Sequence, residues 1–266
     1  MIVVPSGRGW NWVRSGFALF RKSPAMWAFM VFAYIMLMQV LGMIPILGWL
    51  TATVLIPAFS ASFMIISRQL DQDKKLGFAL LFSGFRHNLP LLLAQGGIYL
   101  AIAMLVLGLS ALVDGGALLN MMMLGTKPPG AAYEDGSLAG AALLAGMLYM
   151  PVLAAFWFAP ALSAWQGLPP LQALFYSFFA VLRNWRAFLA YGFAVALSGM
   201  VCSLALFVFA LLLRGVLGNK SQGAFLLVVL PVMLTYVPIL FASFYASYRD
   251  IFPESAPAPE TNAQTP

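Results

Sequence analysis

The feature that most constrains this chain is a set of long runs without a single charged side chain. Ser23–Ser67 covers 45 residues with no Asp, Glu, Lys or Arg, and Gly136–Leu182 covers 47. A helix of roughly 20 apolar residues crosses the hydrocarbon core of a bilayer. Only 8% of the whole chain is charged and 62% is apolar, whereas an ordinary globular chain is about 25% charged. The sequence therefore predicts an all-α polytopic membrane protein, and it excludes a soluble enzyme, a disordered chain and a coiled coil.

Turn residues divide the uncharged runs into six expected spans. Gly42–Gly48, with Pro45 in its middle, interrupts the first run, and Gly167–Pro170 interrupts the second, because Gly and Pro punctuate helical patterns. We expect residues 1–252 to form a single membrane domain and the Pro-rich residues 253–266 to form a disordered tail. The expected spans are residues 25–44, 47–67, 90–112, 139–165, 188–213 and 224–248.

The distribution of basic residues predicts the orientation of the chain. Six spans place both termini on the same side, and that side carries 11 of the 14 Lys and Arg residues. The other side carries only Lys127, Arg214 and Lys220. Cytoplasmic loops of membrane proteins are enriched in Lys and Arg, so we expect both termini to be cytoplasmic.

Two sequence elements recur along the chain in the same order. Phe17–Arg21, Phe82–Arg86 and Phe179–Arg183 align without gaps, and each begins with Phe and ends with Arg. A proline then recurs in each even-numbered span. This order predicts three tandem units, at residues 9–68, 76–166 and 170–250, each made of a surface helix and two spans. We expect them to be related by a pseudo-threefold axis along the membrane normal. The recurring prolines are Pro57, Pro160 and Pro238.

The short segments before the odd-numbered spans are expected to be amphipathic helices on the cytoplasmic surface. Trp10–Arg21 places bulky apolar residues toward one side, with arginines available to anionic head groups, which is typical of an interfacial helix. Leu76–Phe85 and Leu171–Leu182 are more apolar and are expected to be partly buried. A simple anchoring role that fixes the topology remains the alternative. The expected anionic-lipid contacts are Arg14, Arg21, Lys22, Arg86, Arg183 and Arg186.

The repeat also predicts two rings of equivalent residues. Arg21, Arg86 and Arg183 would form one ring at the cytoplasmic face, where each arginine can reach the head groups. The three recurring prolines would form a deeper ring. Proline removes a backbone hydrogen bond from a helix, so Pro57, Pro160 and Pro238 are also the expected kink positions.

Two segments carry a resemblance to known proteins: Gly9–Trp27 and Phe78–Arg86. The chain resembles an uncharacterised family of betaproteobacterial inner-membrane proteins over residues 9–250. It is more distantly similar to YciC-like proteins and to the membrane domains fused to some glycerophosphodiester phosphodiesterases. The resemblance implies a six-span fold in the bacterial inner membrane with no established activity, and no catalytic residue is carried over from it.

The spans contain few side chains that could act in catalysis or in ion binding. They contain no Asp, Glu, Lys, Arg or His at depth. Because such residues are the usual mark of proton relays and ion-coupled sites, this argues against a coupled pump or carrier. Gln39 and Gln95 lie inside spans, where an amide forms an interhelical hydrogen bond or lines a path for a solute. Both readings stay open. The chain has one His and one Cys, and we expect no catalytic residue, no metal site and no cofactor.

These observations lead to two expected functions. The first is a non-enzymatic inner-membrane protein that serves as a structural or lipid-interacting component of the envelope. Its expected partner is the lipid bilayer, including anionic phospholipids; no nucleic acid is expected, and protein partners are left open. The alternative is a passive transporter or channel for an apolar or amphiphilic solute, with a path along the pseudo-threefold axis.

Overall fold

The computed structural model describes residues 1–217 and 222–253, and this part of the chain is helical with no strand. It contains six segments that are long and apolar enough to cross a membrane, so the all-α fold with six spans is confirmed. The predicted tail lies outside the described residues apart from Pro253. The elements are α1 (Arg8–Lys22), α2 (Pro24–Gly42), α3 (Leu47–Asp71), η1 (Phe78–Arg86), α4 (Leu89–Asp114), α5 (Ala117–Leu124), α6 (Gly130–Glu134), α7 (Ser137–Phe156), α8 (Ala159–Gln166), α9 (Pro170–Arg183), α10 (Trp185–Leu217) and α11 (Gln222–Ile251).

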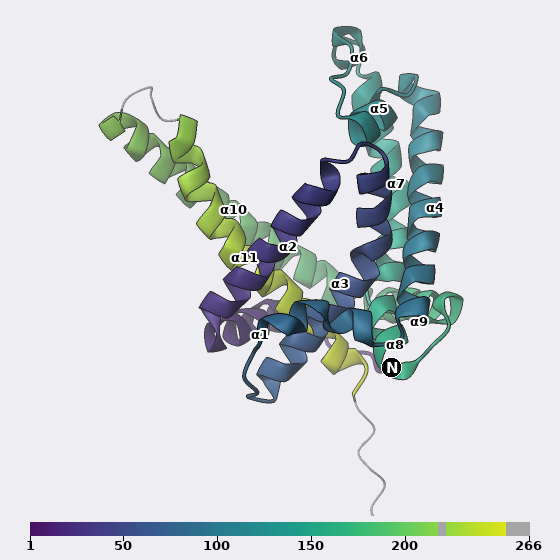
Figure 1. Cartoon of the computed structure of the whole chain (residues 1–266), viewed down its shortest axis with the longest axis vertical. Coiled ribbons are helices and arrows are strands. Elements are labelled where there is room, and N and C mark those ends of the chain that lie inside the picture. The colour runs from purple at the N-terminus through teal and green to yellow at the C-terminus, as the bar shows by residue number, and fades with distance from the viewer. Residues whose placement is uncertain (218–221, 254–266) are drawn as a thin grey trace, which may run out of the picture.

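The helices pack closely at one end of the molecule and diverge at the other (Figure 1). The closely packed end carries α1, η1, α9 and both ends of the described chain, and we call it the terminal face. The opposite end, the loop face, carries the α2–α3 turn together with α5 and α6. Toward the loop face the α10–α11 hairpin leans away from α4 and α7 (Figure 1).

The buried core lies near the terminal face. Its largest fully buried side chains include Trp12, Trp27, Phe59, Phe63 and Phe158, and α3 is the most buried of the six spans. The parts of the spans nearer the loop face instead expose many apolar side chains. A soluble protein rarely exposes continuous apolar surface on this scale, so these exposed stretches are the surface that faces lipid.

The three predicted surface segments all form helices. Trp10–Arg21 lies within α1 and Leu171–Leu182 lies within α9, while the middle segment forms the 3-10 helix η1 rather than an α-helix. Each surface helix packs against a span that returns to the terminal face: α1 against α11, η1 against α3, and α9 against α7 and α8.

Two of these contacts are made through a glycine of the surface helix, at equivalent places along the two spans. A Cβ atom on Gly16 would overlap the carbonyl oxygen of Ile239, and one on Gly84 would overlap that of Ala58. Ile239 and Ala58 are each the residue after a recurring proline. The helix backbones therefore touch directly at corresponding points of the spans, although Gly16 precedes its Phe–Arg element and Gly84 lies inside it. The threefold arrangement of the units and the two predicted rings stay predictions.

The fourth span is divided into two helices beside Pro160, one of the three expected kink positions, although a complete break was not predicted. Its first part, α7, ends at Phe156 and its second part, α8, begins at Ala159. Pro160 has no N–H with which to continue the helical ladder. Ser177 of α9 enters the break: its hydroxyl accepts a hydrogen bond from Phe158 N at 2.9 Å and donates one to Ala154 O at 2.8 Å. The backbone N–H and C=O groups at the break are thus hydrogen-bonded by a side chain of a neighbouring helix.

The other two recurring prolines lie inside continuous helices, Pro57 in α3 and Pro238 in α11. Their role as kink positions stays a prediction. The segment between α4 and α7 forms the short helices α5 and α6, neither of which was predicted. The Asp114 carboxylate accepts hydrogen bonds from the backbone N–H groups of Gly116 and Leu118, at 2.9 and 2.6 Å, which fixes the start of α5.

Candidate functional site

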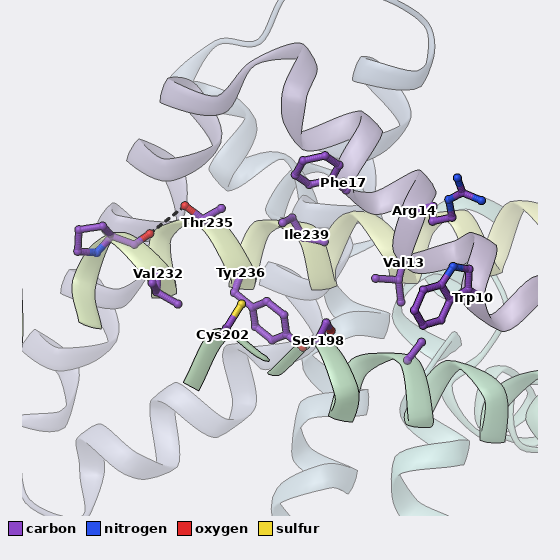
Figure 2. A pocket seen from close by; sticks show the side chains of 12 residues that line it. Trp10, Val13, Arg14, Phe17, Ser198, Cys202, Val232, Thr235, Tyr236 and Ile239 are labelled. Carbon is purple, nitrogen blue, oxygen red and sulfur yellow. Dashed lines mark hydrogen bonds between the residues drawn. The ribbon is translucent and has the colours of Figure 1, made fainter. Parts of the chain in front are cut away.

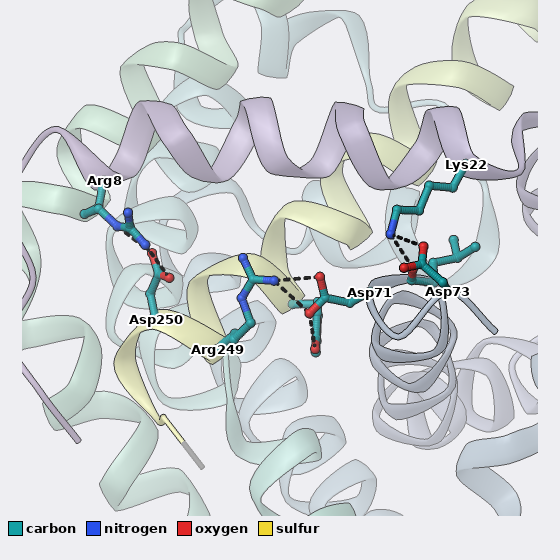
Figure 3. Close-up of polar contacts among 8 residues, drawn as sticks. Arg8, Lys22, Asp71, Asp73, Arg249 and Asp250 are labelled. Carbon is teal, nitrogen blue, oxygen red and sulfur yellow. Dashed lines mark hydrogen bonds and ion pairs between the residues drawn. The ribbon is translucent and has the colours of Figure 1, made fainter. Parts of the chain in front are cut away.

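The acidic side chains that the described chain places at the terminal face are all in ion pairs (Figure 3). Each pair joins elements that are distant in sequence. As a result these carboxylates are occupied by internal partners. The pairs are Arg8–Asp250 at 2.6 Å, Lys22–Asp73 at 2.7 Å and Arg249–Asp71 at 2.7 Å.

Asp250 is the most tightly held of the three. Its carboxylate accepts hydrogen bonds from Nε and Nη2 of Arg8, at 2.8 and 2.6 Å, and from Nε1 of the buried Trp12 at 2.8 Å. Bidentate contacts between Arg and a carboxylate are among the stronger hydrogen bonds in proteins. The hydrogen bond to Asp250, and then its charge, raise the pKa of the Arg8 guanidinium. This group fixes α1 to the end of α11.

The other two pairs secure the end of α3. Lys22 donates to the backbone oxygen of Leu70 at 2.8 Å as well as to Asp73. The Arg249 guanidinium donates to both oxygens of Asp71, each at 2.7 Å, and the Tyr245 hydroxyl donates to Asp71 at 3.0 Å. The predicted lipid contact Lys22 therefore already has two internal acceptors.

The five remaining predicted lipid contacts are exposed and have no ion-pair partner among the described residues. Two of them lie over aromatic rings: Arg21 over Phe17 at 5.8 Å and Arg186 over Trp185 at 5.3 Å. Arg21, Arg86 and Arg183 each lie in the last turn of a surface helix, where a cation is favourable for the helix dipole. The five are Arg14, Arg21, Arg86, Arg183 and Arg186.

A groove lies between α1 and the α10–α11 hairpin, with a volume of about 650 Å³ (Figure 2). We call it the α1 groove. Its walls are mostly apolar, and Arg14 is the one charged side chain among the residues that line it. In Figure 2 Arg14 and Trp10 lie at one end of the groove, while Val232 and Thr235 lie at the other.

The α1 groove is built by close helix contacts near the start and in the middle of α1. A Cβ atom on Gly9 would overlap the backbone of Ala187 in α10, and Gly16 makes the corresponding contact with Ile239 in α11. The Trp12 ring packs on Phe188, with centroids 5.2 Å apart. The side of α1 that carries Trp10, Val13, Arg14 and Phe17 then lines the groove.

The hydroxyl groups in the α1 groove are satisfied within the protein. The Tyr236 hydroxyl donates to the backbone oxygen of Val195 at 2.8 Å and lies 3.0 Å from Ser198 Oγ, and the Thr235 hydroxyl donates to Pro231 O at 2.9 Å. The groove therefore offers apolar contact along its walls. Among the described residues no cluster of three His, Cys, Asp or Glu side chains could hold a metal ion.

A second cavity, of about 290 Å³, lies between α3, the α7–α8 break and α11. Pro57 and Pro160 both line it, but Pro238 is not among its lining residues. The Phe63 and Phe241 rings in its wall stack with centroids 4.1 Å apart. Phe63 is the lining residue of α3 that is nearest in sequence to the terminal face.

The two predicted polar span residues differ in their surroundings. Gln95 is fully buried, and its Nε2 donates to Ala159 O at 3.0 Å and to Ser163 Oγ at 2.7 Å, whereas its Oε1 has no partner. It links α4 to α8. Gln39 is exposed near the loop-face end of α2. Gln95 lies outside both the cavity and the α1 groove.

Sequence reasoning missed the acidic partners of the terminal face and the α1 groove. One signal was available for the first: Asp71, Asp73 and Asp250 lie directly after spans, beside clusters of basic residues. Nothing comparable marked the groove, because Arg14, Ser198 and Thr235 are far apart along the chain and only the packing of α1 brings them together.

A curated protein of Burkholderia thailandensis, described as a probable inner membrane protein, is 37% identical to this chain over 261 residues. The match covers 95% of this chain and 93% of that protein. The chain belongs to the same family of inner-membrane proteins. With its six candidate spans, it is a multi-pass protein of the inner membrane. No protein-family model and no solved structure matches the chain.

Proposed function

We propose that this protein is a non-enzymatic component of the inner membrane, with both termini in the cytoplasm, whose terminal face binds anionic phospholipid head groups. The observation that carries the proposal is the unequal pairing of charge on that face. The three described carboxylates are occupied by Arg8, Lys22 and Arg249. Five other arginines are exposed and have no ion-pair partner among the described residues.

Exposed arginines at this place have a clear physical use. Each basic residue next to an anionic membrane surface contributes about 1 kcal/mol of attraction. Guanidinium groups also bind phosphate in a bidentate manner. A group of such residues on one face favours anionic over zwitterionic lipid, and the internal carboxylates of that face compete little because they are already paired.

Analysis of retained lipid tests this proposal. The protein would be extracted with a mild detergent, and its bound phospholipids would be identified by mass spectrometry and compared with the whole membrane. We expect anionic phospholipids to be enriched, and the triple variant Arg21→Gln, Arg86→Gln, Arg183→Gln to lose much of that enrichment. Lys127→Gln, which alters the other side of the membrane, is the control and should retain it. Equal lipid composition in the triple variant and the wild type would contradict the proposal.

The second candidate function is passive transport of an apolar or amphiphilic solute. It is favoured by the cavity of about 290 Å³ between α3, α7–α8 and α11, together with the divergence of the helices toward the loop face (Figure 1). The stacked rings of Phe63 and Phe241 would then be the constriction that has to open. A flux assay in liposomes separates the two functions, because saturable uptake of a solute would support transport over a purely lipid-binding role.

We also propose that the chain is distantly similar to YciC-like proteins and to the membrane domains fused to some glycerophosphodiester phosphodiesterases. This similarity would reflect a shared six-span architecture rather than shared chemistry, since the features proposed to act here are surface arginines and apolar grooves.

A further inference from the structure

The α1 groove has the dimensions of one leaflet of a bilayer. Along α10 it extends from Ala194 to Cys202, and along α11 from Ile239 to Pro231. Eight residues of α-helix correspond to about 12 Å, and one leaflet of hydrocarbon is about 15 Å thick, half of roughly 30 Å. The groove follows the spans from the region of α1 toward the middle of the membrane, which is the direction of an acyl chain.

The positive charge of the groove lies at one end, where the phosphate of a bound lipid would lie. Arg14 lies at the α1 end of the groove (Figure 2). Its side chain is exposed and has no ion-pair partner among the described residues. The lining offers no carboxylate to the ammonium group of a zwitterionic lipid. A guanidinium over an apolar groove complements an occupant with a phosphate at one end and a hydrocarbon chain at the other.

We infer that the α1 groove holds one acyl chain of an anionic phospholipid from the leaflet at the terminal face, with the lipid phosphate bound by Arg14. The inference rests on the proposed function for the class of lipid. It goes further by assigning a single site, built by α1, α10 and α11, that is distinct from the exposed arginines at the ends of the surface helices.

The chain carries its own reporter for this site, because its one cysteine, Cys202, is half-buried and lines the groove. The purified full-length protein in a non-ionic detergent would be treated with a small maleimide, and the rate of Cys202 modification would be followed by mass spectrometry. Increasing amounts of phosphatidylglycerol or of phosphatidylcholine would be added to parallel samples. We expect phosphatidylglycerol to slow the modification several-fold in a saturable manner, and phosphatidylcholine to do so only at much higher concentration.

Two matched variants locate the head-group contact. Arg14→Gln should raise the phosphatidylglycerol concentration needed for half-protection by about tenfold. Lys75→Gln removes an exposed cation that lies in the α3–η1 connection of the same face and does not line the groove, and it should leave that concentration nearly unchanged. Equal protection by the two lipids, or equal behaviour of Arg14→Gln and Lys75→Gln, would overturn the inference.

A third variant tests the acyl-chain part of the site. Thr235 is an exposed residue of the groove wall, so Thr235→Phe should fill the groove without disturbing the core. Native mass spectrometry should then show one fewer tightly bound phosphatidylglycerol than for the wild type, and an unchanged number would overturn the site. If the wild-type protein enriches anionic lipid but phosphatidylglycerol does not protect its Cys202, the groove site is refuted and the wider proposed function stands. If phosphatidylglycerol protects Cys202 but the extracted protein shows no enrichment of anionic lipid, the wider proposed function is refuted and the groove site stands.

Discussion

At the scale of single residues, Asp250 has the greatest structural consequence on the terminal face. The side chain of Asp250 is 10% exposed, while that of Asp73 is 82% exposed. Asp250 also satisfies the indole N–H of Trp12, a residue that is 1% exposed. Both carboxylates are paired with a basic residue, but Asp250 is more buried and accepts more hydrogen bonds than Asp73. The removal of the two should therefore have different costs.

We predict that Asp250→Ala lowers the free energy of unfolding by about 1–3 kcal/mol, because it leaves the buried Trp12 N–H without an acceptor. Asp73→Ala should cost less than about 1 kcal/mol, because exposed ion pairs contribute little. Thermal unfolding of both variants in the same detergent measures the difference. Equal losses would mean that Asp250 is no more than a surface partner of Arg8.

At the scale of elements, the position of α1 depends on two points where helix backbones touch. Gly16 meets the carbonyl of Ile239, and Gly9 meets the backbone of Ala187. By contrast, nothing lies within 4 Å of a Cβ atom placed on Gly146, in α7. These two kinds of glycine cannot be distinguished from sequence, because both lie inside helices and no local pattern marks which of them touches a neighbouring helix.

We predict that Gly16→Ala destabilises the protein by about 1–3 kcal/mol, the usual cost of forcing extra volume into a packed contact. It should also move α1 away from α11 and so enlarge the α1 groove. Gly146→Ala should be neutral or stabilising by up to about 1 kcal/mol, because Ala favours helix over Gly. Thermal unfolding of the two variants is the measurement, and similar stability for both would show that α1 is not docked through Gly16.

The six spans could be predicted from the sequence, whereas the break between α7 and α8 could not. Runs of uncharged residues indicate the spans because hydropathy is a local property, so all six were found. The break between α7 and α8 was missed because it depends on Ser177, which reaches Ala154 and Phe158 from another helix. Proline at 160 alone did not distinguish this broken span from α3, which remains continuous through Pro57.

At the scale of the whole molecule, the exposed arginines were predicted from charge placement alone, but their division into paired and unpaired groups was not. Lys22 was grouped with Arg21 by proximity, and only the fold shows that it is paired with Asp73. The α1 groove likewise arises from packing of the first helix against the last two. Contacts between the two ends of a chain leave no local pattern in its sequence.

The central claim of this account is that the basic terminal face lies against the cytoplasmic leaflet, where anionic lipids give the membrane surface its negative potential. Fusions of a cytoplasmic and a periplasmic reporter test this claim most directly. We predict that fusions after Asp73, after Leu168 and at the C-terminus are active only as cytoplasmic reporters. Fusions near Pro128, in the loop between α5 and α6, should be active only as periplasmic reporters. A periplasmic reporter that is active after Asp73 or at the C-terminus would place the exposed arginines on the wrong side and would contradict the account.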